Sequence, residues 1–401
     1  MKLLLWTGNG IFIDSFGGAE RVACNMGNEF LRRGWEVTIV CNDIKAGLPA
    51  YPLDKEIRLI NLNGTGERLA KAPPLLKVAR EITRPLRHIG FTYFIDRCEA
   101  AKSRFFLEHL ESVVRKSRPD VVVPFFINDL LAFCQCPSSH RIPIVQMLHD
   151  TPEIAVGPEN TAVRRALDRT AAVQVLMESF VPGIRQRCSA ETVVIPNAVP
   201  QYEDHLDHRE KESYRIINIA RLEPKQKRQH LLIDAFALLA SDFPNWTLHF
   251  YGTDVGGDYQ TRLKNQIERL GMTNRVFLEG TTDRVRDAML SADIFAFPSK
   301  HEGFGIALVE AMGVGLPAVG FRSTPAVNEM IHDGENGVLT EDGVRAFAEG
   351  LRSLMKDRGW RTRLGENGRL FARQFESRRV WDQWESLLKS VIERHPVRGW
   401  R

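Results

Sequence analysis

Residues 299–315 have the sequence SKHEGFGIALVEAMGVG, and this stretch decides how the rest of the chain is interpreted. Residues 306–312 predict a helix that is apolar on every face except at one carboxylate, Glu310. A second carboxylate, Glu302, lies among glycines just before that helix. Because burying an unpaired carboxylate carries a high free-energy cost, we expect both glutamates to meet a ligand or a basic partner.

The loop before this helix has the features of an anion site. Gly303 and Gly305 allow a ligand to approach the backbone closely. A helix that begins near Gly305 presents unpaired amides and partial positive charge, which suit a phosphate. Glu310 lies more than one turn further along and can accept two hydrogen bonds from the diol of a ribose, so the stretch predicts a nucleotide site. The alternative is that Glu310 pairs with a basic residue of the protein and that Glu302 is solvated.

A basic segment in the second half of the chain favours the nucleotide. Residues 219–236 have the sequence IARLEPKQKRQHLLIDAF, in which Arg221 directly follows an apolar run. Lys225, Lys227 and Arg228 lie at the start of the next predicted helix. Cations placed there suit a diphosphate, because arginine offers a planar fork and lysine a mobile point charge. The alternative is a solvated basic loop.

The order of predicted elements indicates two α/β domains. The chain has 401 residues, which suggests more than one hydrophobic core. Strand and helix signals alternate, which predicts parallel sheets covered by helices. We predict two doubly wound Rossmann-like domains, residues 1–195 and 213–375, which face each other across a cleft, with the ligand at the carboxyl ends of the strands. Residues 196–212 are predicted to be a solvated linker, and residues 376–401 a helix that packs back on the first domain.

Composition excludes several classes of protein. The content is 43% hydrophobic and 26% charged, with a formal net charge of +4, which does not indicate a dedicated nucleic-acid binder. The six cysteines form no CxxC framework, so we expect reduced thiols and no metal site. The charged linker sequence DHLDH is interpreted as solvated rather than as a metal site. The apolar start of MKLLLWTGNG is too short for a signal peptide, and there is no GxxxxGK[ST] phosphate loop.

These parts together resemble a family-four retaining glycosyltransferase of the GT-B fold, over most of the chain. The matching positions are Glu302 and Glu310 for the E-x7-E motif, Arg221 and Lys227 for the basic pair, Gly17-Gly18-Ala19-Glu20-Arg21 for the glycine loop, His149-Asp150 for the HD pair and Pro196-Asn197 before the linker. The chain departs from the family at Ala220 and Arg228, where glycine is common.

The resemblance implies transfer of a hexosyl group from a nucleotide-diphosphate sugar, most commonly a UDP-sugar, to a hydroxyl of a glycan or lipid-linked acceptor, with no cofactor. Arg221 and Lys227, rather than Lys225, would neutralise the diphosphate, and Glu310 would hold the ribose. His149 would lie near the reacting carbon. The implied catalytic residues are His149, Arg221, Lys227 and Glu302, and the implied donor-binding residues are Gly17, Gly18, Arg221, Lys227, Thr282, Val285, Glu302, Gly303, Phe304, Gly305, Ile306 and Glu310.

Alternatives stay open at this stage. His149 precedes a predicted helix start at which Asp150 or Thr151 is the cap, so His149 and Asp150 have a structural interpretation as well. A nucleotide-sugar epimerase of related architecture and a non-catalytic nucleotide-sugar binding protein are the competing functions.

Residues 77–106 combine basic and aromatic side chains and suit an anionic lipid surface, although the aromatic residues, Phe106 among them, could equally pack in a core. We expect a cytoplasmic protein, at the inner face of the plasma membrane if that contact forms.

Overall fold

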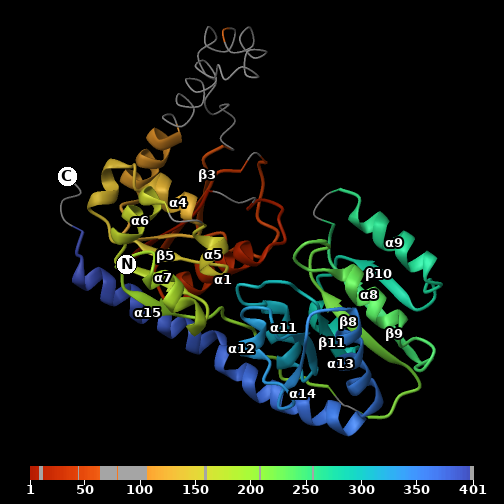
Figure 1. Ribbon diagram of the computed structural model, residues 1–401. Helices are drawn as coiled ribbons and strands as arrows, with labels where there is room; N and C mark the ends of the chain where they lie inside the picture. The colour runs from red at the N-terminus through yellow and green to blue at the C-terminus, as the bar shows by residue number, and fades with distance from the viewer. Residues whose placement is uncertain are drawn as a thin grey trace. The chain divides into compact units, whose positions relative to one another are not determined.

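The computed structural model describes residues 1–8, 12–43, 45–63, 79, 106–157, 160–206, 209–254 and 257–397 (Figure 1). The chain divides into two compact units. Unit 1 comprises Met1–Ile195 and Trp381–Arg401, and unit 2 comprises Pro196–Val380. Each unit is an α/β body built on parallel strands.

Unit 1 begins with β1 (Lys2–Thr7), whose apolar residues are almost wholly buried, as in a parallel sheet covered on both faces. In its first sheet, β1 pairs with β2 (Glu36–Cys41) and β4 (Val121–Pro124), and β2 pairs with β3 (Arg58–Asn61). A second sheet contains β5 (Val145–Met147), β6 (Ala172–Val175) and β7 (Thr192–Val194). The parallel bridge between Val122 and Ile144 joins the two sheets, so their carboxyl ends share one edge.

Helices surround these sheets. They are α1 (Gly18–Arg32), α4 (Ile127–Phe133), α5 (Pro152–Ala155), α6 (Thr161–Asp168) and α7 (Val181–Arg185). The last helix, α15 (Ser377–Arg394), belongs to unit 1 from Trp381 onward. Arg33 anchors it, because its Nη1 lies 2.8 Å from carboxylate oxygens of both Asp382 and Glu385.

Unit 2 contains one six-stranded parallel sheet in the order β10-β9-β8-β11-β12-β13. The strands are β8 (Tyr214–Ile219), β9 (Trp246–Tyr251), β10 (Val276–Gly280), β11 (Ile294–Phe297), β12 (Ala318–Phe321) and β13 (Gly337–Thr340). The helices are α8 (Gln229–Ala237), α9 (Tyr259–Arg269), α10 (Val285–Leu290), α11 (Ile306–Gly313), α12 (Val327–Met330), α13 (Val344–Lys356) and α14 (Arg358–Ala372).

The strand order of unit 2 marks a binding position. From β8 the chain adds strands in one direction, and from β11 it adds them in the other. The crevice at the carboxyl ends of β8 and β11 is therefore a topological switch point, where open α/β sheets bind ligands.

The predicted solvated linker over residues 196–212 is wrong in one respect, because its apolar residues pack on unit 2. Val199 is fully buried and its N–H donates to the Phe375 carbonyl at 2.9 Å. The N–H of Leu206, which is also buried, donates to the Val314 carbonyl at 2.9 Å. The two apolar side chains gain more from the core than from water. Among the described residues, which exclude 207 and 208 of the DHLDH sequence, no group of three or more His, Cys, Asp or Glu is placed to hold a metal.

The basic and aromatic segment 77–106 lies outside the described residues, apart from Ala79 and Phe106. The Phe106 ring lies 5.8 Å from the ring of Trp6 in β1, so Phe106 packs inward and does not belong to a lipid-facing set. Within the described ranges, no helix is both long enough and apolar enough to cross a membrane.

Candidate functional site

Two loops meet at the switch point of unit 2. One follows β8 and carries Arg221 and Lys227, and the other follows β11 and carries Glu302. Backbone and side-chain hydrogen bonds join them: the Lys300 N–H donates to the Gln226 carbonyl at 2.8 Å, and Gln226 Nε2 donates to the His301 carbonyl at 3.1 Å. The strand order therefore brings together residues that are 75 positions apart in the chain.

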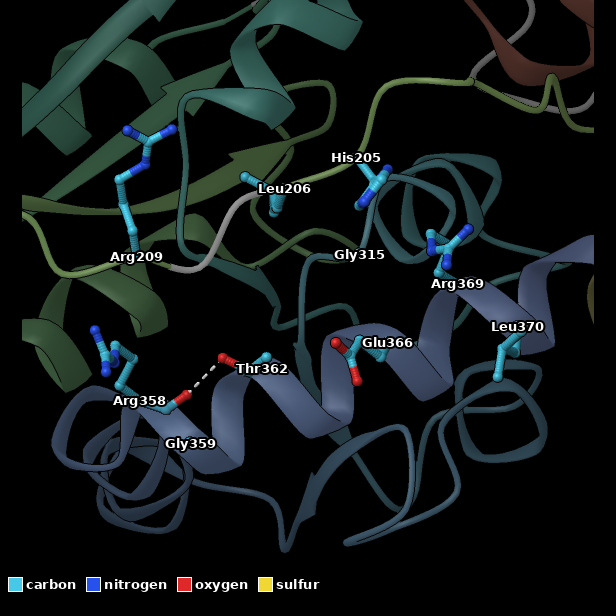
Figure 2. A pocket seen from close by; sticks show the side chains of 10 residues that line it. All are labelled: His205, Leu206, Arg209, Gly315, Arg358, Gly359, Thr362, Glu366, Arg369 and Leu370. Atoms are coloured by element: carbon cyan, nitrogen blue, oxygen red, sulfur yellow. Dashed lines mark hydrogen bonds between the residues drawn. The ribbon is translucent and has the colours of Figure 1, made fainter.

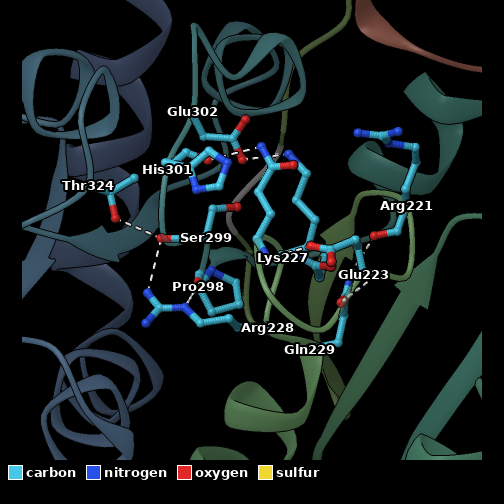
Figure 3. Close-up of polar contacts among 12 residues, drawn as sticks. Arg221, Glu223, Lys227, Arg228, Gln229, Pro298, Ser299, His301, Glu302 and Thr324 are labelled. Atoms are coloured by element: carbon cyan, nitrogen blue, oxygen red, sulfur yellow. Dashed lines mark hydrogen bonds and ion pairs between the residues drawn. The ribbon is translucent and has the colours of Figure 1, made fainter. Parts of the chain in front are cut away.

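Lys227 and Glu302 form an ion pair at the centre of this site (Figure 3). Lys227 Nζ donates to Glu302 Oε1 at 2.6 Å, and the two side chains are 12% and 7% exposed. The ammonium also lies 5.7 Å from the centre of the Phe297 ring. The pair uses one of the three ammonium donors and one of the two carboxylate oxygens, so this geometry can also accommodate an anion next to a hydroxyl group.

Glu310 lies in α11 among side chains that are shielded from water. It is 2% exposed, and its neighbours Leu308, Val309, Ala311 and Met312 are fully buried. Gly305 precedes the helix with φ of 82°, a conformation that glycine adopts without strain. A Cβ at Gly305 would lie 3.3 Å from the Phe297 ring, so this position is also tight.

Gly303 and Phe304 are buried, and Ile306 opens the helix half-buried. The loop thus holds Glu302 and the first amides of α11 at the same edge of the sheet. Amides at the start of a helix in such a loop can bind an anion such as a phosphate.

The basic segment after β8 does not act as one cluster. Arg221 and Lys225 are exposed, and the Arg221 carbonyl accepts a hydrogen bond from Gln229 Nε2 at 2.8 Å (Figure 3). Arg228 instead turns its guanidinium into the protein, where Nε donates to the Pro298 carbonyl at 2.9 Å. The Arg228 side chain is therefore engaged with neighbouring loops of the protein.

Glu223 is a residue that the sequence interpretation missed. Its carboxylate accepts hydrogen bonds from the N–H groups of Lys225 and Gln226, and its carbonyl accepts one from the Lys227 N–H. The side chain therefore shapes the turn that carries Lys227. The proline after it is typical of turns, but no spacing rule linked Glu223 to its acceptor role.

Thr282 and Val285 follow β10, at the same edge of the sheet. Gly280 ends the strand with φ of 77°, and the Thr282 hydroxyl accepts a hydrogen bond from the Arg284 N–H at 3.0 Å. Val285 begins α10 and is half-buried. Thr282 therefore lies in the loop after the carboxyl end of β10 and Val285 at the start of the next helix, and β10 is two strands away from β8.

His149, Gly17 and Gly18 belong to unit 1. His149 follows β5, and its ring stacks on Phe125 with 5.0 Å between ring centres. The residue as a whole is half-buried, but its Nε2 is shut off from water and has no hydrogen-bond partner among the described residues. Burial lowers the pKa of His149 to about 4, so the imidazole is neutral near pH 7.

The other unit 1 positions lie at the starts of helices. Gly17 is the N-cap of α1 with an extended backbone, and Gly18 is the first residue of that helix. Thr151 is the N-cap of α5, with Pro152 as its first residue, and the Asp150 carboxylate accepts the Thr151 N–H at 2.8 Å. Gly17 and His149 both follow carboxyl ends of strands and so lie at one edge of unit 1.

A separate cavity of about 880 Å³ lies on unit 2 (Figure 2). It is lined in part by Leu206, Gly315, Arg358 and Glu366, and none of the predicted site residues lines it. Leu206 precedes β8 and Gly315 precedes β12, so the cavity lies at the amino edge of the sheet. It is therefore distinct from the Lys227–Glu302 site.

Comparison with known proteins identifies the class. The family described as Glycosyltransferase Family 4 matches residues 16–201, and the family described as Glycosyl transferases group 1 matches residues 202–371. The parallel sheets of both units and these matches define a glycosyltransferase of the GT-B fold. Together the two matches cover residues 16–371, and the chain belongs to the glycosyltransferases.

Two relatives match nearly the whole chain. An exopolysaccharide phosphotransferase of Streptomyces coelicolor is 27% identical over 388 residues, which cover 95% of this chain but 40% of that protein. An uncharacterised glycosyltransferase of Haemophilus influenzae is 23% identical over 380 residues, which cover 94% of this chain and 97% of that protein.

Two solved structures have the same fold. Sucrose-phosphate synthase from Thermosynechococcus elongatus has a TM-score of 0.77 at 15% identity, and the match covers 98% of this chain and 99% of that one. Anabaena HepE, solved in complex with UDP-glucose, has a TM-score of 0.72 at 20% identity, and the match covers 97% of this chain and 100% of that one.

Proposed function

We propose that the protein transfers a hexosyl group from a UDP-sugar to a hydroxyl of a glycan or lipid-linked acceptor, with retention of the anomeric configuration. The observation that carries the proposal is the Lys227–Glu302 pair, with 2.6 Å between Nζ and Oε1, beside the amino end of the helix that buries Glu310. The Lys227 cation and the helix terminus suit a diphosphate. Glu302 suits a sugar, and Glu310 suits a ribose.

The chemistry follows from charge. As the bond between the sugar and the diphosphate lengthens, negative charge grows on the leaving diphosphate. Lys227, the exposed Arg221 and the amino end of α11 would stabilise that charge. Glu302 would accept hydrogen bonds from the sugar hydroxyls, and Glu310 from the ribose diol. Thr282 and Val285 would border the base.

Donor and acceptor are inferred from relatives. HepE was solved with UDP-glucose, which supports a UDP-sugar as donor here. The name of the Streptomyces coelicolor relative refers to exopolysaccharide, which supports a bacterial surface glycan as product. His149, Gly17 and Gly18 of unit 1 would serve the reacting carbon and the acceptor.

Metal independence is part of the proposal, because Arg221 and Lys227 would do the work that a divalent cation does in other transferases. Transfer in the presence of a chelator should match transfer without it. Activity that disappears with the chelator and returns with magnesium would contradict this part of the proposal.

Contact with an anionic membrane through residues 77–106, Phe106 excepted, also stays a proposal. It predicts that the protein sediments with liposomes in proportion to their anionic lipid content, and less at high salt, because such attraction is screened. Binding that ignores both lipid charge and salt, or no binding, would point to an acceptor in solution.

Nucleotide release from a panel of UDP-sugars, measured with and without glycan acceptors, tests the function. A transferase releases UDP in step with a new glycoside when the acceptor is present. An epimerase yields an epimer or free sugar without any acceptor, and a binding protein releases nothing.

A further inference from the structure

Arg228 has an unusual backbone conformation for an arginine. Its φ of 51° and ψ of 40° place it in the left-handed region, as the N-cap of α8. A residue with a Cβ is strained there, whereas glycine is not. The strained backbone at Arg228 is therefore offset by side-chain interactions that a glycine could not make.

The guanidinium makes those interactions with two other loops. Nε donates to the Pro298 carbonyl at 2.9 Å and Nη2 to the Ser299 carbonyl at 3.2 Å, both in the loop after β11 (Figure 3). Nη1 donates to Asp342 Oδ1 at 3.0 Å, in the loop after β13. The guanidinium carbon lies 4.6 Å from the centre of the Phe321 ring at the end of β12. Only a planar fork can reach these partners together.

The partners of Arg228 extend the connection. The Ser299 carbonyl also accepts a hydrogen bond from Thr324 Oγ1 at 2.7 Å, and Asp342 Oδ2 accepts one from Ser323 Oγ at 2.5 Å. Arg228 therefore links the loops that follow β8, β11, β12 and β13. Gln226, on the other side of Lys227, makes the second connection to the β11 loop, through Lys300 and His301.

Lys227 thus lies between two residues that fasten its loop to the loop of Glu302. We propose that Arg228 is a positioning residue, which fixes Lys227 against Glu302 and so sets the spacing between the phosphate-binding and the sugar-binding groups. This inference rests on the proposed function. Nε, Nη1 and Nη2 of Arg228 each donate to a neighbouring loop, so the role proposed for Arg228 is to position Lys227 rather than to bind the ligand.

The test compares Arg228→Gly with wild type. Glycine relieves the backbone strain, so the variant should fold, but it removes the contacts that the Arg228 side chain makes with the other loops. We expect kcat to fall about 10- to 100-fold, since small displacements of catalytic groups cost that much. KM should change little, because Lys227 acts mainly on charge that grows in the transition state. Guanidinium ion at millimolar concentration should restore part of the rate in this variant alone.

Two further variants complete the design. Asp342→Asn keeps Arg228 but weakens one contact, and should give a smaller loss of kcat in the same direction. Arg352→Ala is the matched control: Arg352 pairs with Asp242 at 2.7 Å and lies 6.0 Å from the Phe243 ring, on α13 of the same unit. It should leave kcat unchanged.

A second readout does not depend on turnover. Hydrogen exchange in residues 223–228 and 298–303 should increase together in Arg228→Gly and stay as in wild type in Arg352→Ala. If Arg228→Gly lowers only the melting temperature and folded protein keeps the wild-type kcat, or if exchange in the two segments is unchanged, the inference is overturned. If wild type releases no nucleotide from any donor, the proposed function fails instead, and hydrogen exchange alone decides the role of Arg228.

Discussion

The Lys227–Glu302 pair could have only a structural role in unit 2, or it could also bind the ligand. Mutation distinguishes these two possibilities. With side chains 12% and 7% exposed, neither charge is well solvated. A buried pair that loses one partner leaves an uncompensated charge, whereas loss of both partners removes the problem.

Lys227→Met should therefore destabilise unit 2 by about 3–5 kcal/mol, and the double variant Lys227→Met with Glu302→Gln by clearly less. Both variants should lose transfer, because the cation that meets the leaving diphosphate is absent. Urea denaturation and nucleotide release measure the two effects. A double variant that regains stability and transfers at the wild-type rate would show that the pair has only a structural role.

His149 is neutral near pH 7, and its lowered pKa affects the stability of the fold. Its pKa is lowered by burial to about 4 in the folded chain, below its ordinary value of 6.5. Between those two values the unfolded chain binds the proton and the folded chain does not, so this residue makes the folded state less stable as pH falls from 6.5 towards 4.

His149→Phe should remove this dependence, because phenylalanine keeps the stacking on Phe125 but carries no proton. The unfolding free energy of wild type, measured relative to the variant in urea, should fall between pH 6.5 and pH 4. A difference that stays constant over this range would mean that His149 titrates normally in the folded protein.

At the scale of elements, the site depends on the turn that begins α11. Gly305 has a φ of 82°. Gly334, in the turn before β13, has a similar φ of 74°. A Cβ at Gly305 would press on Phe297, whereas one at Gly334 would meet nothing within 4 Å. The two glycines therefore share a backbone requirement but not a location.

Replacing either glycine with alanine should cost about 1–2 kcal/mol of stability, because a Cβ is unfavourable in the left-handed region. Only Gly305→Ala should also weaken UDP binding, since it shifts the amides at the start of α11. Thermal unfolding and calorimetric titration measure the two effects. Equal UDP affinity in both variants would argue against phosphate binding at this helix terminus.

Elements with continuous apolar runs were predicted well from the sequence. The apolar runs at residues 294–297 and 2–7 predict buried strands, and these residues form β11 and β1. β13 and α14 were not predicted: Gly337–Thr340 is short and contains a glycine, and Arg358–Ala372 is polar with three glycines. Such segments become regular through tertiary packing rather than through their own pattern.

The site was predictable in parts but not as an assembly. Glu302, Glu310 and Lys227 could each be selected from local pattern and resemblance. The contact between Lys227 and Glu302 requires β8 and β11 to be neighbours, which depends on strand order and not on local sequence. The partners of Arg228, the carbonyls of Pro298 and Ser299, belong to another loop, so local sequence does not distinguish Arg228 from the neighbouring cations.

At the scale of the whole molecule, the two units carry different parts of the proposed reaction. Unit 2 holds the charged groups around Lys227 and the buried Glu310, and unit 1 holds His149 and the glycine pair. Unit 2 would bind the nucleotide, and every other assignment depends on where the donor lies.

Calorimetric titration of UDP into wild type, Glu310→Gln and the control Glu349→Gln tests this claim most directly. Glutamine keeps the size of Glu310 but loses the charge that would hold the ribose diol, while Glu349 is exposed on α13. Hydrogen bonds to a charged group contribute about 1.5–3 kcal/mol, so Glu310→Gln should bind UDP at least about 10-fold more weakly than wild type. Glu349→Gln should bind as wild type does. Equal UDP affinity in all three proteins would contradict the placement of the nucleotide at Glu310.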